Sequence, residues 1–198
     1  RDIRQRKELE RALKQERDLL RATSRIQHDL ILEASEGGDP VQEVCRLAVE
    51  EGGLALAWVG WVGPEGAVES VAACGAASDY LHRLRIRLDP SVPEGQGPTA
   101  TAIREGRAVI VPDWDRDSRI SPWRERAQEA GIRASAAFPL WREGEAAGAL
   151  NVYASQPDAF TEGLEHLLEQ LAGALGYALD RRERERQRRE LADVVEAT

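Results

Sequence analysis

The sequence lacks methionine altogether and begins at Arg1. Because translation starts with methionine, we expect this chain to be a piece of a longer protein. It has two cysteines, Cys45 and Cys74, which are too few for a disulfide framework or a zinc site. It also lacks any apolar run near the ~18 residues that a membrane-spanning helix needs. These absences predict a domain with no structural metal and no membrane segment, in a reduced, cytoplasmic setting.

Basic charge is also in short supply, with 27 lysines and arginines against 35 acidic residues, a net charge of -8. A nucleic-acid-binding surface needs a basic field, so nucleic acid is not expected as a partner. Hydrophobic residues make up 42% of the chain and charged residues 31%. A core can therefore form, but part of the chain must be very polar.

The polar parts lie at the two ends. Residues 1–35 contain neither proline nor glycine and predict a linker helix, on which Leu9, Leu13 and Leu20 share one stripe. The stripe has gaps, so two interpretations stay open: a helix paired with a second copy of the chain, or a solvated helix. Residues 179–198, in which arginines alternate with glutamates, predict a second, solvated linker helix.

Between the linkers, residues 36–178 mix helix and strand signals. Asp39 is suited to cap a helix, with Pro40 at its first position and Gln42 three residues after the cap, which predicts a variant of the capping box in which Gln42 bonds back to the cap. A second helix is predicted from Pro98 to Gly106, a third from an N-cap at Ser121 with Pro122 to Gly131, and a fourth after Thr161. Strands are predicted at 54–62, 67–74, 85–88, 108–111, 134–141 and 146–154.

Most of these strands are neighbours along the chain and joined by short turns, which is typical of antiparallel pairing. The mixture of such strands with helices predicts an α+β fold, with a central antiparallel sheet and helices on both faces. The long helices at residues 1–35 and 179–198 would flank it.

Four motifs carry a family resemblance: G-Q-G-P-T-A at 95–100, R-A-V-I-V-P-D at 107–113, P-W-R…G-I-R-A-S-A-A-F-P-L at 122–140, and G-A-L-N-V-Y at 148–153. Together they resemble a GAF domain, the small-molecule sensor module of bacterial signalling proteins, over residues 36–178. The resemblance implies a six-stranded antiparallel sheet. Its first and last helices would cover one face, and a ligand pocket would lie on the other.

By this resemblance the pocket is walled by the helix at Pro98, by the loop after the fourth strand and by one face of the sheet. The apolar strand pattern does not fix which face looks inward. The candidate ligand-binding residues are Trp58, Trp61, Tyr80, Pro98, Thr99, Asp113, Trp114, Trp123, Phe138 and Tyr153. The free N–H groups of Thr99 and Ala100 at the helix start suit an anion, although an ordinary helix start has the same groups.

Specific chemistries known in this family each lack a required residue. The cyclic-nucleotide signature is matched at Asn151 but has Val152 and Leu164 in place of lysine and aspartate. Bilin attachment and sulfoxide reduction need pocket cysteines, which Cys45 and Cys74 do not supply.

Two further sites, for haem and for calcium, are suggested by a few residues each. Haem would need an axial histidine, for which His82 is the candidate. Asp113, Asp115 and Asp117 resemble the start of a calcium loop, but the later ligands are missing, and Arg116 and Arg119 are expected to pair with the acids. The sequence therefore predicts no metal, no cofactor and no catalytic residue.

The start of the chain, D-I-R-Q-R-K at residues 2–7, resembles the tail of a PAS domain, which implies that such a domain precedes it. The resemblances together predict a non-enzymatic sensory domain that binds an unknown small ligand and forms a homodimer through its terminal helices. It would signal to an output domain of the diguanylate cyclase, phosphodiesterase or histidine kinase type. The expected transmission residues are Leu9, Leu13, Leu20, Leu171 and Leu175. The alternatives are a ligand-free dimerisation spacer, its pocket filled by its own tryptophans, and a haem sensor that uses His82.

Overall fold

The computed structural model describes residues 38–196 and, before them, the isolated residues 3, 5–7, 10, 13, 14, 17, 21 and 24. The predictions for Leu9 and Leu20 lie outside the described residues. Leu13 is helical and 57% exposed. Among the helices described, none combines the length and apolar character needed to cross a membrane.

A five-stranded sheet forms the centre of the domain, with the order β2-β1-β5-β4-β3 and every neighbouring pair antiparallel. The strands are β1 (Leu56–Val62), β2 (Val68–Cys74), β3 (Val109–Val111), β4 (Ala134–Arg142) and β5 (Glu145–Ala154). This confirms the α+β class and the antiparallel sheet.

The sixth strand, expected at 85–88, is not among the described strands. This segment makes one isolated bridge, between Ala67 and Arg87. Pro90 follows two residues later and has no N–H to continue a ladder, so the pairing stops at the bridge. The prediction of six strands was therefore wrong, because the segment 85–88 does not form a strand of the described sheet.

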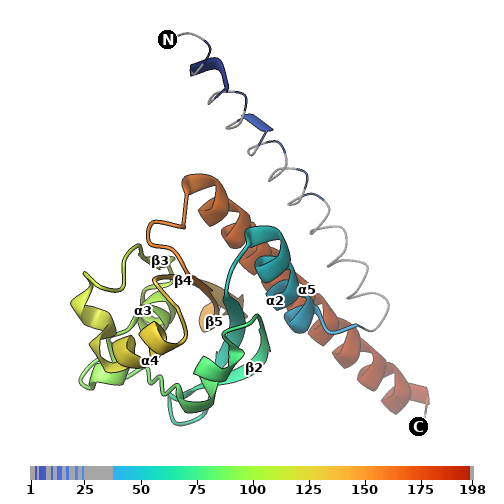
Figure 1. Cartoon of the computed structure of the whole chain (residues 1–198). Helices are drawn as coiled ribbons and strands as arrows, with labels where there is room; N and C mark the ends of the chain where they lie inside the picture. Colours follow the sequence, from blue (N-terminus) through green and yellow to red (C-terminus); the bar gives the residue numbers. More distant parts are fainter. Residues whose placement is uncertain are drawn as a thin grey trace.

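Helices cover both faces of the sheet (Figure 1). Helices α2 (Pro40–Gly52) and α5 (Glu162–Glu196) pack together on one face, called here the helical face. The opposite face, called the pocket face, carries α3 (Pro98–Glu105), α4 (Arg124–Glu129) and the 3₁₀ turns η1 (Ser78–Arg83) and η3 (Ser118–Trp123). A further 3₁₀ turn, η2 (Pro93–Gly95), precedes α3.

The start of α2 follows its sequence signals in part. The Asp39 side chain accepts a hydrogen bond from the Val41 N–H at 3.0 Å, as expected of an N-cap. The expected back-contact from Gln42 is absent, because its Nε2 donates instead to the carbonyl of Ala73 on β2, at 3.0 Å. The capping-box prediction was wrong because the hydrogen bond to β2 turns the Gln42 side chain away from the cap.

The expected cap at Ser121 was also wrong. Asp117 caps this region by accepting from the Arg119 N–H at 2.9 Å, and the chain first forms η3, with Pro122 inside it. Helix α4 then begins at Arg124. The cause is local: an aspartate four residues earlier takes the capping role, so the chain is already turning when it reaches Ser121.

The sheet separates two apolar cores. On β1, Leu56 and Trp58 belong to the core of the pocket face, whereas Ala57 and Val59 belong to that of the helical face, as the period of two requires. Leu171 and Leu175 of α5 are 1% and 0% exposed within the helical-face core. They pack against their own sheet, so they do not offer a direct contact to a partner chain.

Candidate functional site

A small cavity lies on the pocket face, between the sheet, η1, α3 and the segment that carries η3. Its volume is about 10 Å³, close to the minimum that one water molecule needs. In the described part of the chain its lining has no charged side chain. The lining residues are Tyr80, Leu84, Ile86, Gly97, Pro98, Thr99, Ala100, Trp114, Trp123 and Tyr153.

Three aromatic rings of the lining pack edge to face. The ring centroids of Tyr80 and Trp114 are 6.5 Å apart, those of Tyr80 and Tyr153 are 5.6 Å apart, and those of Trp114 and Tyr153 are 6.0 Å apart. Their planes are inclined at 61–74°. Edge-to-face contacts of this kind add about 0.5–1.5 kcal/mol each beyond burial. The three rings therefore hold one another in place.

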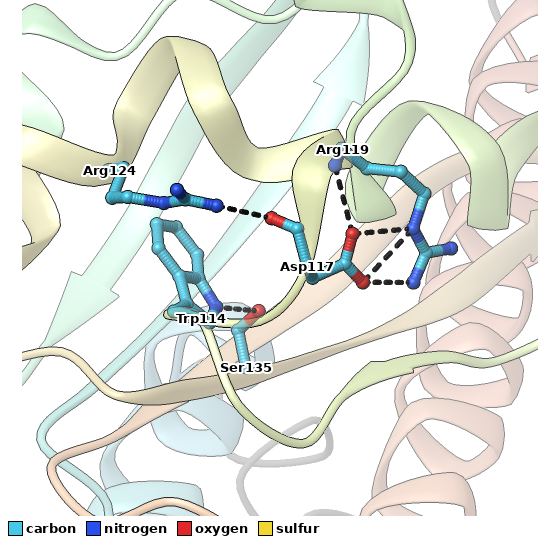
Figure 2. Close-up of polar contacts among 5 residues, drawn as sticks. All are labelled: Trp114, Asp117, Arg119, Arg124 and Ser135. Atoms are coloured by element: carbon cyan, nitrogen blue, oxygen red, sulfur yellow. Dashed lines mark hydrogen bonds and ion pairs between the residues drawn. The ribbon is translucent and has the colours of Figure 1, made fainter.

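Two of these rings, Trp114 and Tyr153, are hydrogen-bonded through their polar groups to residues of the sheet. Trp114 Nε1 donates to Ser135 Oγ on β4 at 2.8 Å (Figure 2). Tyr153 Oη accepts from Trp58 Nε1 at 3.3 Å. These bonds hold the polar atoms of Trp114 and Tyr153 against the sheet, and both residues line the cavity.

Asp117, in the segment between Trp114 and Trp123, bonds to two arginines. Figure 2 shows its contacts with Arg119 and Arg124. The Asp117 carboxylate pairs with the Arg119 guanidinium at 2.5 Å, and its carbonyl accepts from Arg124 at 2.7 Å. The hydrogen bonds from Arg119 hold the pKa of Asp117 below its usual range. As expected for this loop, Arg119 pairs with Asp117.

Trp123 closes the cavity against the backbone of Gly97. A β-carbon at Gly97 would lie 2.5 Å from Cη2 and Cζ3 of the indole, so this contact requires glycine. Trp123 Nε1 also donates to the Arg85 carbonyl at 3.3 Å. The indole of Trp123 thus joins three segments that are distant in sequence.

One side chain of the lining lacks a hydrogen-bond partner. Tyr80 is 7% exposed, and its hydroxyl is buried without a partner among the described residues. Burial raises the pKa of Tyr80 above its ordinary value, and the neighbouring Tyr153 adds to the shift. The hydroxyl therefore keeps its proton and remains a hydrogen-bond donor.

Helix α3 presents its N-terminus to the same cavity. Gly97 is its N-cap and supplies no side-chain oxygen. The first hydrogen bond of the helix runs from the Thr101 N–H to the Gly97 carbonyl, at 3.1 Å. The N–H groups of Thr99 and Ala100 precede it and have no partner within the helix. The Thr99 hydroxyl donates to Asn151 Oδ1 on β5 at 2.7 Å and ties the helix to the sheet.

Of the ten residues predicted to bind a ligand, six line the cavity. They are Tyr80, Pro98, Thr99, Trp114, Trp123 and Tyr153. Trp58 lies behind Tyr153 in the core of the pocket face. Whether any of them binds a ligand stays a prediction.

The other three lie elsewhere. Trp61 and Phe138 pack with the helical-face core, because their positions in β1 and β4 have the opposite parity from Trp58 and Ser135. The guanidinium of Arg142 lies 4.1 Å from the Trp61 ring centroid. Asp113 is not in the lining: its carboxylate accepts from the Asp115 N–H and pairs with Arg116 at 3.3 Å. The expected Arg116 pairing is thereby confirmed.

His82, the candidate haem ligand, lies on the surface and not in the cavity. The His82 side chain is 80% exposed, and its Nε2 lies 3.6 Å from Asp79 Oδ1. It does not line the cavity. The suggestion that His82 holds a haem there was wrong, because η1 turns Tyr80 inward and His82 outward.

Both cysteines lie on the helical face. Cys45 is buried in that core, and burial raises the pKa of its thiol to about 12. Cys74 is half-buried against the same core. Neither thiol lines the cavity.

Sequence reasoning missed Leu84, Ile86 and Gly97 as lining residues. The sequence did contain a signal for which face of the sheet lines the pocket, however. Asn151 and Tyr153 are two residues apart on a strand whose other residues, after Glu145 at its start, are small or aliphatic. With a period of two they must share a face, and a buried polar side chain marks the face that offers it a partner.

Known proteins share this architecture. The family model described as "GAF domain" matches residues 39–180. No curated protein matches the chain.

Several solved structures resemble it. Free methionine-R-sulfoxide reductase from Neisseria meningitidis, in complex with its substrate, is 19% identical, with a TM-score of 0.67 over 84% of this chain and 90% of that one. A GAF domain region from Geobacter sulfurreducens PCA is 24% identical, with a TM-score of 0.56 over 79% and 96%. The GAF domain of a phosphoenolpyruvate-protein phosphotransferase from Coxiella burnetii is 16% identical, with a TM-score of 0.64 over 86% and 97%. The family model covers most of the sequence, and the chain therefore belongs to the GAF domain family.

Proposed function

We propose that this domain is a sensory module that binds a small ligand in the cavity on its pocket face. One observation carries the proposal: the Tyr80 hydroxyl is buried in the cavity wall without a partner among the described residues. Leaving a buried donor unpaired costs about 1–3 kcal/mol, and buried polar groups are nearly always paired. A bound ligand would supply the missing acceptor.

The cavity has to open before it can hold more than a water molecule. Trp123 is the natural gate, because its ring contacts the lining at Gly97 and its one hydrogen bond, to Arg85, is long at 3.3 Å. In contrast, Trp114 is fixed to the sheet by a 2.8 Å hydrogen bond. Displacement of the Trp123 indole would free a space of about its own size.

Strand β5 offers a route from the cavity to the helices. Tyr153 lies on the pocket face, whereas Leu150 and Val152 lie in the helical-face core with Leu171 and Leu175 of α5. A ligand that moves Tyr153 would also shift Leu150 and Val152, which pack against α5. This requires that the domain has two arrangements and that the ligand binds them with different affinity. Helix α5 continues without a break to Glu196 and would transmit the change.

We further propose that the chain forms a homodimer through its terminal helices and controls an output domain of the cyclase, phosphodiesterase or histidine kinase type. The exposed Leu13, Leu191 and Val194 support a helix-to-helix contact beyond the core. Light scattering of the whole chain tests this. A dimer mass supports it, and a monomer mass at high concentration contradicts it.

A regulatory role is favoured over catalysis. One similar structure is a sulfoxide reductase. Reduction of a sulfoxide by thiols needs a reactive thiolate beside the substrate. Here the Cys45 thiol is buried on the helical face with a pKa of about 12, away from the cavity.

A ligand-free dimerisation spacer is the second candidate. The observation in its favour is the cavity volume of about 10 Å³, because the domain's own aromatic rings fill most of the site.

A thermal-shift panel of nucleotides, amino acids and aromatic acids separates the two. A true ligand at 100 times its Kd would stabilise the folded state by about 2.7 kcal/mol. That shift should vanish in Ala100→Leu, which fills the cavity, and persist in Val71→Ala on the exposed side of β2. If no compound in a broad panel raises the Tm of the wild-type chain, the spacer is correct.

A further inference from the structure

Three hydrogen-bond donors lie at one small cavity. They are the hydroxyl of Tyr80 and the backbone N–H groups of Thr99 and Ala100. The cavity measures about 10 Å³, and all three residues line it. Their sources are independent, since Tyr80 comes from η1 and the two amides from the first turn of α3.

The start of α3 has the features of an anion-binding site. A helix N-terminus usually receives a side-chain oxygen from serine, threonine, aspartate or asparagine at its N-cap. Here the N-cap is Gly97, with no side-chain cap, and the first turn holds no acidic residue. Neither the N-cap nor the first turn therefore compensates the partial positive charge of the helix end. Thr99 and Ala100 are 3% and 0% exposed, so water has little access to their amides.

The second observation concerns Tyr80, which lines the same cavity. The Tyr80 hydroxyl belongs to a side chain that is 93% buried, and it has no acceptor among the described residues. Burial and the nearby Tyr153 keep the phenol protonated. A carboxylate is the acceptor that fits best, because its two oxygens can accept from several donors at once and no acidic side chain lines the cavity to repel it.

The other lining residues indicate what the body of the ligand must be like. Trp114, Trp123 and Tyr153 provide aromatic surface, and Leu84 and Ile86 provide aliphatic surface. The indole N–H of Trp114 is already bonded to Ser135, and that of Trp123 to the Arg85 carbonyl. The walls therefore offer apolar contact. A flat, apolar body suits such walls, and it gains space if the Trp123 ring moves off Gly97.

We propose that the cavity binds a small aromatic carboxylic acid. Its carboxylate accepts hydrogen bonds from Tyr80, Thr99 and Ala100, and its ring lies against Trp114 in the space that Trp123 vacates. The inference rests on the proposed function, that this cavity is the ligand site.

Matched pairs of carboxylate and amide test it, titrated calorimetrically into the whole 198-residue chain. The pairs are benzoate and benzamide, phenylacetate and phenylacetamide, and indole-3-acetate and indole-3-acetamide. At least one carboxylate should bind about tenfold or more tightly than its amide, as expected for charge-assisted hydrogen bonds. Tyr80→Phe keeps the ring and removes the hydroxyl, and it should weaken that carboxylate about tenfold while changing its amide less.

Amide NMR spectra of the wild-type chain supply a readout that does not depend on a variant. The carboxylate should shift the N–H signals of Thr99 and Ala100. The N–H of Val41, at the N-terminus of α2, is already bonded to Asp39 and should stay in place. The same pattern in response to the amide at equal affinity would overturn the carboxylate assignment.

The outcomes separate this inference from the proposed function. If every carboxylate fails to bind, or if the amides bind as tightly, the assignment to carboxylic acids is wrong. The proposed function would still stand if nucleotides or neutral amino-acid derivatives shift the Trp114 and Trp123 signals. It fails only if those compounds also leave both signals unchanged.

Discussion

The indole of Trp123 packs directly against Gly97, so closely that a β-carbon on Gly97 would lie 2.5 Å from the ring. This contact joins the segment after β3 to the start of α3 and closes the cavity between them. Moving the Trp123 indole to open the site would therefore break this contact.

Gly97→Ala should force Trp123 out of its position. Overpacking of this kind costs about 1–3 kcal/mol of unfolding free energy. Chemical denaturation measures that loss, and a red shift of tryptophan emission reports the exposed indole. The matched control is Gly173→Ala, a helical position of α5 with open space among the described residues, which should stabilise the domain by up to about 1 kcal/mol. Equal stability of the two variants would show that the Trp123 contact is not tight.

Thr99→Val should destabilise the link between α3 and the sheet. It removes the hydroxyl that donates to Asn151 Oδ1 at 2.7 Å and leaves that buried oxygen without its donor, at a cost of about 1–3 kcal/mol. Thr101→Val, on the same helix, removes an exposed contact to Arg104 and should change stability by less than about 0.5 kcal/mol. Similar denaturation midpoints for the two variants would contradict this assignment.

Asp117→Ala should destabilise the domain in a pH-dependent way. At pH 7 the loss of the cap and of the Arg119 pair should cost about 1 kcal/mol. Because the folded-state pKa of Asp117 is lowered, its contribution is present above its ordinary pKa of about 4 and is lost as the pH falls through the folded-state value. The gap between wild type and variant should therefore narrow in acid. Asp193→Ala, near the exposed end of α5, controls for the loss of one charge.

The two thiols should differ in reactivity. With its pKa raised to about 12, Cys45 should react with iodoacetamide about a thousandfold more slowly than an ordinary thiol at pH 8. Mass spectrometry of the folded chain should find alkylation at the half-buried Cys74 first, and at Cys45 only after denaturant is added. Equal labelling of both thiols without denaturant would place Cys45 outside the core.

Local signals in the sequence predicted elements well where one residue type controls the backbone. Asp39 with Pro40 began α2, and Gly106, at φ 62°, followed the end of α3. They failed where two residues compete for one role. Asp117 took the cap expected of Ser121, and Gln42 bonded to a strand distant in sequence.

The site was predictable to the extent that it lies on loops and helix starts. Pro98, Thr99, Trp114 and Trp123 lie there, and all four line the cavity. On the sheet, the uniformly apolar strands concealed which face looked inward, and Trp61 and Phe138 were placed on the wrong side for that reason. The closure of the cavity by Trp123 and Gly97 depends on packing between distant segments, which no local pattern encodes.

The five tryptophans allow the central claim to be tested in one measurement. Trp114 and Trp123 line the cavity and Trp58 lies behind it, whereas Trp61 packs on the helical face and Trp141 is 46% exposed at the end of β4. Indole N–H spectra of the whole chain should be recorded with the panel of nucleotides, amino acids and aromatic acids. A ligand in the proposed site should shift the signals of Trp114 and Trp123, with a smaller shift at Trp58, and leave Trp61 and Trp141 in place. Shifts confined to Trp61 and Trp141, or a panel that moves no indole signal, would contradict a ligand site on the pocket face.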